Sequence, residues 1–120
     1  MNIEDFIDYE LNRKIIIDPI ETEFSLTRDE LLILGLINKF NYIDEIYLSD
    51  LIFYINKYKL HYTRPMKRLA QKNFFKKKRH PQDERIVILY DIDYQKINLL
   101  FLTINKKHLS NFKKPKTSKN

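Results

Sequence analysis

The stretch 75–90, FKKKRHPQDERIVILY, decides the fold of this chain. Four basic residues, 76–79, precede a His-Pro pair, and an Asp-Glu-Arg triplet then leads into an apolar run of strand character. Pro81 restricts the backbone between the two strand-like runs, so the pattern predicts a hairpin with its tip at residues 80–83. The role of a basic hairpin with Arg85 beside its tip depends on the elements that surround it in the sequence.

Length and composition favour a single folded domain. The chain has 120 residues and is 43% hydrophobic, with eight Tyr and eight Phe. We expect one folded domain over residues 1–112 and a disordered basic tail over 113–120. One Gly and no Cys exclude Gly-rich phosphate loops, disulfides and thiol chemistry. Three isolated His predict neither a metal site nor a cofactor.

The charges are separated along the chain. Residues 1–56 carry 4 Lys/Arg and 12 Asp/Glu, whereas residues 57–80 carry 10 Lys/Arg and no acid. A solvated basic face is the ordinary explanation of such a run. Its purity and its interspersed aromatic residues favour a surface that binds phosphate groups. No stretch is long and apolar enough for a membrane span, and the N-terminus is acidic, so we expect a cytoplasmic protein without a membrane partner.

Helical spacing of apolar residues predicts the helices that precede the basic run. A first helix is expected over 3–17, stopped by Pro19. The sequence TRDE at 27–30 has the form of a capping box and opens a strongly apolar helix that ends near Phe40. Apolar residues on most sides of this second helix indicate that it lies at the centre of the core.

The next two helices are short and close together. The third is expected over about 49–56, and the fourth begins within 60–65 and ends near Lys72. Two short helices, the second far more basic, are typical of a helix-turn-helix. The outward residues expected to contact DNA from the fourth helix are His61, Arg64, Lys67, Arg68 and Lys72. A last helix starts after Asp93, which we expect to be its N-cap.

A helix-turn-helix followed by a strand–loop–strand indicates a winged helix-turn-helix, which is α+β, mostly helical, with about five helices and a hairpin wing. The fourth helix would enter the major groove, and Arg85 would probe the narrow minor groove of A·T tracts. Asp83 can hold a guanidinium, from Arg85 or Arg79, in a fixed direction. The wing residues expected at DNA are Lys77, Lys78, Arg79, Gln82, Asp83, Glu84 and Arg85.

KKKRHPQDERIVILY, together with YLSDLIFYIN and MKRLAQKNFF upstream of it, resembles the SarA family of staphylococcal regulators, a branch of the MarR-like winged-helix proteins. The resemblance covers about 27–104 and, loosely, the first helix. It implies a homodimer on AT-rich promoter DNA that regulates virulence and surface-protein genes. It also implies that the first and last helices build the dimer. The dimer residues we expect there are Phe6, Leu11, Tyr94, Phe101 and Ile104.

Pro65 departs from the family pattern, since it falls where relatives have an uninterrupted recognition helix. We expect a late start, with Thr63 or Arg64 as the cap, an extended Arg64 and a helix of about two turns. Other readings stay open at this point. The Arg85–Asp83 pair could simply close the hairpin, and the domain could bind RNA or an acidic protein. A nuclease built on Asp83 and Glu84 lacks a third ligand, so we expect no enzyme. The sequence shows no effector pocket.

Overall fold

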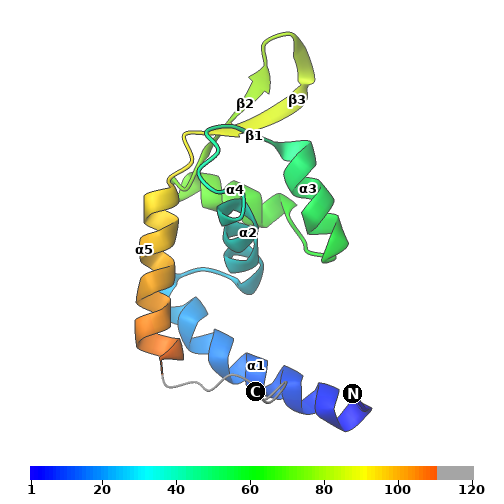
Figure 1. Cartoon of the computed structure of the whole chain (residues 1–120), viewed down its shortest axis with the longest axis vertical. Coiled ribbons are helices and arrows are strands. Elements are labelled where there is room, and N and C mark those ends of the chain that lie inside the picture. Colours follow the sequence, from blue (N-terminus) through cyan, green and yellow to red (C-terminus); the bar gives the residue numbers. More distant parts are fainter. Residues whose placement is uncertain (111–120) are drawn as a thin grey trace.

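The computed structural model describes residues 1–110, which form a winged helix (Figure 1). The predicted α+β, mostly helical fold is confirmed, with five α-helices and a hairpin wing. The elements in chain order are α1 (Ile3–Phe24), α2 (Arg28–Asn38), β1 (Ile46–Tyr47), α3 (Leu48–Lys57), α4 (Thr63–Gln71), β2 (Lys76–His80), β3 (Asp83–Tyr90), α5 (Tyr94–Ile104) and the π-helical turn η1 (Asn105–Leu109). The expected tail, 113–120, lies outside the described residues.

The first helix is longer than the sequence suggested. α1 runs through Pro19 to Phe24, so the expected stop at Pro19 is wrong. Proline removes one backbone donor, but the turn after it is held by other contacts. Ile20 is buried, and Ser25 adopts a left-handed conformation (φ 54°) that caps the helix with an N–H bond to the carbonyl of Glu21. The burial of Ile20 and the C-cap at Ser25 therefore keep the helix continuous through Pro19.

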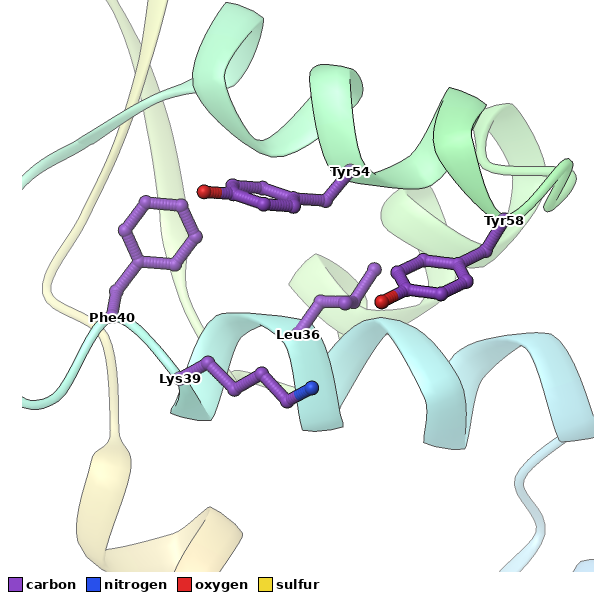
Figure 2. Close-up of a pocket in the computed structure, with 5 residues that line it drawn as sticks. All are labelled: Leu36, Lys39, Phe40, Tyr54 and Tyr58. Carbon is purple, nitrogen blue, oxygen red and sulfur yellow. The ribbon is translucent and has the colours of Figure 1, made fainter.

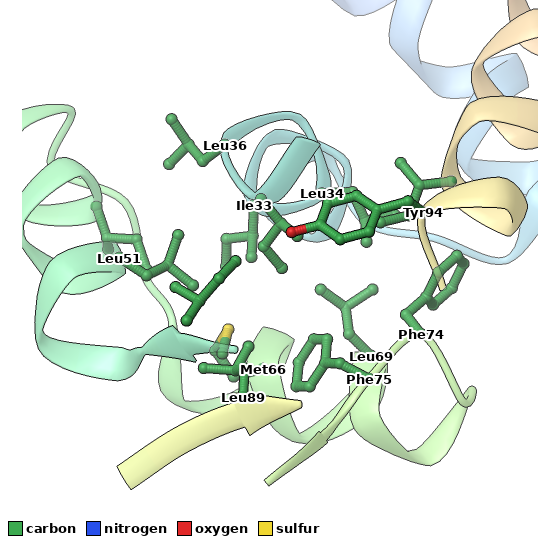
Figure 3. Close-up of a cluster of buried hydrophobic side chains, with 14 of the residues drawn as sticks. Ile33, Leu34, Leu36, Leu51, Met66, Leu69, Phe74, Phe75, Leu89 and Tyr94 are labelled. Carbon is green, nitrogen blue, oxygen red and sulfur yellow. The ribbon is translucent and has the colours of Figure 1, made fainter. Parts of the chain in front are cut away.

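The core is centred on α2, as its apolar sequence predicted. Thr27 is the N-cap, and its side chain accepts a hydrogen bond from the N–H of Glu30 at 3.2 Å. Ile33, Leu34 and Ile37 are fully buried in α2. They pack in one cluster with buried residues from α3, α4, the connection between α4 and β2, β3 and α5. These residues are Leu51, Ile55, Met66, Leu69, Phe74, Phe75, Leu89, Tyr94 and Ile97 (Figure 3). The cluster holds the helix-turn-helix, the wing base and α5 together.

The second helix of the helix-turn-helix, α4, is short, as expected. Its N-cap is Tyr62, so the expectation that Thr63 or Arg64 caps it is wrong, as is the expectation of an extended Arg64. Pro65 lies in the first turn of α4, where a backbone N–H would have no acceptor within the helix. Proline therefore costs no intrahelical hydrogen bond at this position. Its ring is buried, and Met66 closes the turn with an N–H bond to the carbonyl of Tyr62 at 2.8 Å.

The hairpin is the upper arm of the molecule in Figure 1. β3 is the central strand of a three-stranded antiparallel sheet with the order β1-β3-β2, and β2 is an edge strand. Lys77 lies opposite Leu89, and Arg79 opposite Val87, but His80 lies opposite Asp83, so residues 84–86 have no partner across the arm. This irregularity sets the wing tip apart from the regular strands below it.

α5 and the turn η1 that follows it connect the wing strand β3 to the end of α1. Asp93 caps α5 by accepting the N–H of Lys96 at 2.9 Å, as predicted. In η1, Lys107 and His108 both bond the carboxylate of Glu23 at the end of α1, at 2.6 and 2.8 Å. The molecule is elongated, 51 × 30 × 28 Å, with the wing at one end and α1 at the other (Figure 1). None of the helices within residues 1–110 has the length and apolar character that crossing a membrane requires.

Candidate nucleic-acid interface

The edge strand β2 carries its cations on two faces. Because side chains alternate along a strand, Lys76 and Lys78 share one face, and Lys77 and Arg79 share the other. The first face is neutralised by acids: Lys76 is 3.3 Å from Asp91, and Lys78 is 2.6 Å from Glu45. Lys77 and Arg79 are exposed and make no ion pair with any of residues 1–110. They are the β2 cations most available to phosphate.

The wing tip holds its arginine in a fixed direction. Asp83 accepts two hydrogen bonds from the Arg85 guanidinium, at 3.0 and 3.1 Å, and a third from its backbone N–H at 3.1 Å. The Arg85 side chain remains 91% exposed. Arg79 donates to the carbonyl of Glu84 at 2.7 Å, so the Glu84 carboxylate takes no part in that contact. The Asp83 carboxylate therefore fixes the direction of the Arg85 guanidinium, while the N–H groups that point away from Asp83 remain available to a ligand.

The Asp83–Arg85 contact also shows in the pKa values of the pair. The side chain of Arg85, and then its backbone N–H, lower the pKa of the Asp83 carboxyl below its ordinary value. The side-chain hydrogen bonding with Asp83 also raises the pKa of Arg85. Since the pKa of Asp83 is depressed on folding, the contact is present at neutral pH and is lost only as the pH falls through that lowered value.

An NMR titration of the side-chain carboxyl carbons tests this. We expect the midpoint of Asp83 to lie below that of an unperturbed Asp, and Arg85→Ala to return it to the ordinary range. An Asp83 midpoint that is the same in both proteins would show that the guanidinium is not held by Asp83 in solution.

The cations of the α4 segment fall into two groups. His61, Arg64 and Lys67 are exposed and form no ion pair within residues 1–110. Arg68 and Lys72 instead turn toward Glu30 of α2, whose side chain is 1% exposed. Lys72 bonds both Glu30 and the carbonyl of Ser25, so the structure gives this predicted DNA contact two partners inside the protein.

The residues expected at the dimer interface are placed unevenly. Phe6 and Leu11 are exposed on α1, and Phe101 is half-buried on α5. Tyr94 and Ile104 are buried within the single chain. The Tyr94 hydroxyl donates to the carbonyl of Ile43 at 2.8 Å, and burial raises the pKa of that phenol.

Sequence reasoning missed two leucines of α5, Leu99 and Leu102, which are 64% and 62% exposed. They line a hollow of about 680 Å³ that continues into η1. Their spacing of three residues places them on one helical face, and that spacing is the signal that could have found them.

Sequence reasoning also missed the acids that pair with the cations. Glu30 and Glu45 lie 42 and 33 residues from Lys72 and Lys78 along the chain. No local sequence pattern predicts ion pairs between residues so far apart in the chain. Glu30 stands beside Asp29 in the acidic first turn of α2, where carboxylates are common, so the sequence does not indicate that this one is buried.

A second surface lies on the far side of α2, where α3 crosses it (Figure 2). Leu36, Lys39, Phe40, Tyr54 and Tyr58 line a cavity of about 180 Å³ there. The Phe40 and Tyr54 rings meet edge to face with their centroids 6.2 Å apart, and the Phe53 and Tyr54 rings do the same at 5.3 Å. Phe53 is itself 66% exposed, so this aromatic surface is only partly covered.

Comparison with known proteins identifies the family. The family described as Transcriptional regulator SarA/Rot matches residues 15–99, which span the helix-turn-helix and the whole wing. The chain belongs to the SarA/Rot family. This SarA/Rot protein is 34% identical over 90 residues to Transcriptional regulator SarA of Staphylococcus aureus strain Newman. The match covers 73% of this chain and 72% of that one, and SarA of strain USA300 matches equally.

Among solved structures, YusO protein from Bacillus subtilis covers 95% of this chain and 87% of its own, at 16% identity and a TM-score of 0.46. The family resemblance inferred from the wing sequence is confirmed. This chain therefore belongs to a family of transcriptional regulators and has a winged-helix fold, and the relatives it matches are named transcriptional regulators.

Proposed function

We propose that this SarA/Rot protein binds AT-rich promoter DNA as a homodimer and regulates virulence-related genes. The observation that carries the proposal is Arg85, 91% exposed beside the tip of a protruding arm and aligned by both carboxylate oxygens of Asp83. The minor groove of an A·T tract is narrow and strongly negative, and an inserted guanidinium is the group that such a groove attracts.

The fourth helix supplies the major-groove contact. α4 exposes Arg64 and Lys67 near its start, preceded by His61, and the N-terminal residues of a recognition helix are those that reach base edges. With nine residues, α4 offers few such contacts. Affinity therefore depends strongly on phosphate contacts, to which Lys77 and Arg79 of the wing contribute.

The homodimer is supported by apolar surface that the single chain leaves uncovered. Ile3, Phe6, Leu11 and Ile15 of α1 are each about half exposed or more, and Leu99 and Leu102 lie open on α5. Apolar patches of this kind on an isolated chain mark an interface. α1 lies at the opposite end of the molecule from the wing, and α5 runs from the base of the wing toward it (Figure 1), so a second copy joined along these helices leaves both wing tips free.

Selection of bound duplexes from a random pool, read at two salt concentrations, tests the proposal. We expect recovered sites rich in A·T, arranged as two half-sites about one helical turn apart. We also expect the logarithm of the binding constant to fall with the logarithm of salt, by about 0.9 for each phosphate contacted. Recovered sequences without base preference, or binding insensitive to salt, would contradict it.

A second candidate function is the binding of an acidic protein. The aromatic surface of Phe53, Tyr54 and Tyr58 favours it, because Lys39 and Lys57 flank exposed rings. Competition separates the candidates. We expect duplex DNA to be displaced neither by a structured RNA nor by an acidic polypeptide at equal concentration, and displacement by either would favour that partner instead.

A further inference from the structure

Glu30 is an ionisable side chain buried in the core layer beneath the fourth helix. It belongs to α2, and its side chain is 1% exposed. Its Oε1 atom accepts a hydrogen bond from Lys72 Nζ at 2.9 Å, while Oε2 is buried and has no hydrogen-bond partner among residues 1–110. A buried carboxylate is costly unless a cation accompanies it, so Lys72 is held here by the protein's own charge.

Arg68 is attracted by the same carboxylate but not bonded to it. Its Nη1 atom lies 3.6 Å from Glu30 Oε2, and its side chain is 47% exposed. A hollow of about 580 Å³ adjoins the three side chains, so the guanidinium has room to leave Glu30. Arg68 is therefore shared between Glu30 and whatever anion approaches α4 from outside.

Arg68 of α4 and Lys72, the C-cap of the same helix, lie four residues apart and face one carboxylate on α2. Residues at this spacing lie on one side of a helix, so the contact fixes the rotation of α4 about its own axis. Lys72 also donates to the carbonyl of Ser25, the residue that caps α1. The same lysine thus joins the recognition helix to the turn between α1 and α2.

We propose that Glu30 is a positioning residue that determines the DNA specificity of this protein. It fixes the rotation of α4 and withholds the charges of Lys72 and, in part, Arg68 from the phosphates of any sequence. This inference rests on the proposed function. Its physical basis is that phosphate contacts add affinity without sequence information, whereas base contacts depend on the orientation of the helix.

The variant Glu30→Gln tests the proposal, with Asp29→Asn as its matched control. Both remove one negative charge from the first turn of α2, but Asp29 contacts Arg28 rather than α4. For Glu30→Gln we expect tighter binding to a random duplex and a salt slope steeper by about 0.9 for each cation set free. Between 50 and 200 mM salt this is about a three- to fourfold larger loss of affinity per cation. The ratio of specific to non-specific affinity should fall, and Asp29→Asn should change neither quantity.

A role confined to stability would give a different result. In that case Glu30→Gln would lower the melting temperature and leave the salt slope and the specificity ratio equal to those of Asp29→Asn, which would overturn the proposal. Failure of the unaltered protein to bind duplex DNA would instead overturn the proposed function. The two failures are therefore distinguishable.

A second pair of variants keeps the test open if Glu30→Gln does not fold. Lys72 is held by Glu30, whereas Lys67 has no ion pair within residues 1–110, so Lys67→Met should reduce the salt slope by about 0.9 and Lys72→Met should leave it nearly unchanged. An equal reduction by both variants would show that Lys72 binds phosphate and would overturn the proposal.

Discussion

Replacing Leu99 with Asp should convert the proposed dimer into monomers and weaken binding to a duplex with two half-sites by about 10²–10⁴-fold, the range in which linked binding sites exceed a single one. Leu99 is 64% exposed on α5, beside Leu102 and the hollow that continues into η1. A carboxylate placed in an apolar contact would lose its hydration when the two copies associate, which is unfavourable. Sedimentation equilibrium measures the association, and a titration on the duplex measures the affinity.

Phe53→Asp is the matched control for the state of association. Phe53 is 66% exposed, so the substitution removes a similar apolar surface, but it lies on α3 and outside the proposed interface. We expect this variant to sediment as the unaltered protein does. A Leu99→Asp protein that still sediments as a dimer would show that a different surface joins the two copies.

Arg85→Ala should weaken binding to an AT-rich duplex by about 1–3 kcal/mol, the range for a specific arginine contact. The side chain is almost fully exposed and packs on no core residue, so its removal should leave the free energy of unfolding nearly unchanged. Lys14→Ala is the control for loss of one cation, because Lys14 is 74% exposed on α1, at the other end of the molecule. Equal affinities of the two variants would remove Arg85 from the interface.

Arg85→Lys separates charge from shape. It keeps the positive charge but cannot make the bidentate contact with Asp83 that directs the guanidinium. If the wing acts only through phosphate attraction, this variant should bind as the unaltered protein does. We expect most of the affinity for A·T-rich sites to be lost, with little change on random duplexes.

Local patterns predicted the parts of the fold that local physics determines. The two strand-like runs on either side of Pro81 placed the hairpin, and the apolar run after Thr27 identified α2 as the central helix. Pro19 misled the prediction of α1, because the packing of Ile20 and the cap at Ser25 are tertiary and C-terminal features that override one lost hydrogen bond. The strand β1 has two residues, too few for any periodicity.

The sequence predicted which residues of the candidate site carry positive charge, but not how available each of these charges is to a ligand. The sequence identified the cations of α4 and the wing, yet it could not show which of them the protein neutralises itself. Glu30 and Glu45 reach Lys72 and Lys78 across long sequence separations. Asp83 and Arg85 are two residues apart, and for that reason their contact could be foreseen.

The basic edge strand β2 also bears on how this protein behaves at high concentration. An unpaired strand edge is a template on which a neighbouring chain can add a strand, the first step toward fibrils. Lys76, Lys77, Lys78 and Arg79 are all exposed along this edge, and two such edges repel each other. Lys77 and Arg79, which no acid within residues 1–110 neutralises, contribute both to colloidal stability and to attraction toward polyanions, so substitutions that remove these two charges to weaken nucleic-acid binding also make the protein more prone to precipitate.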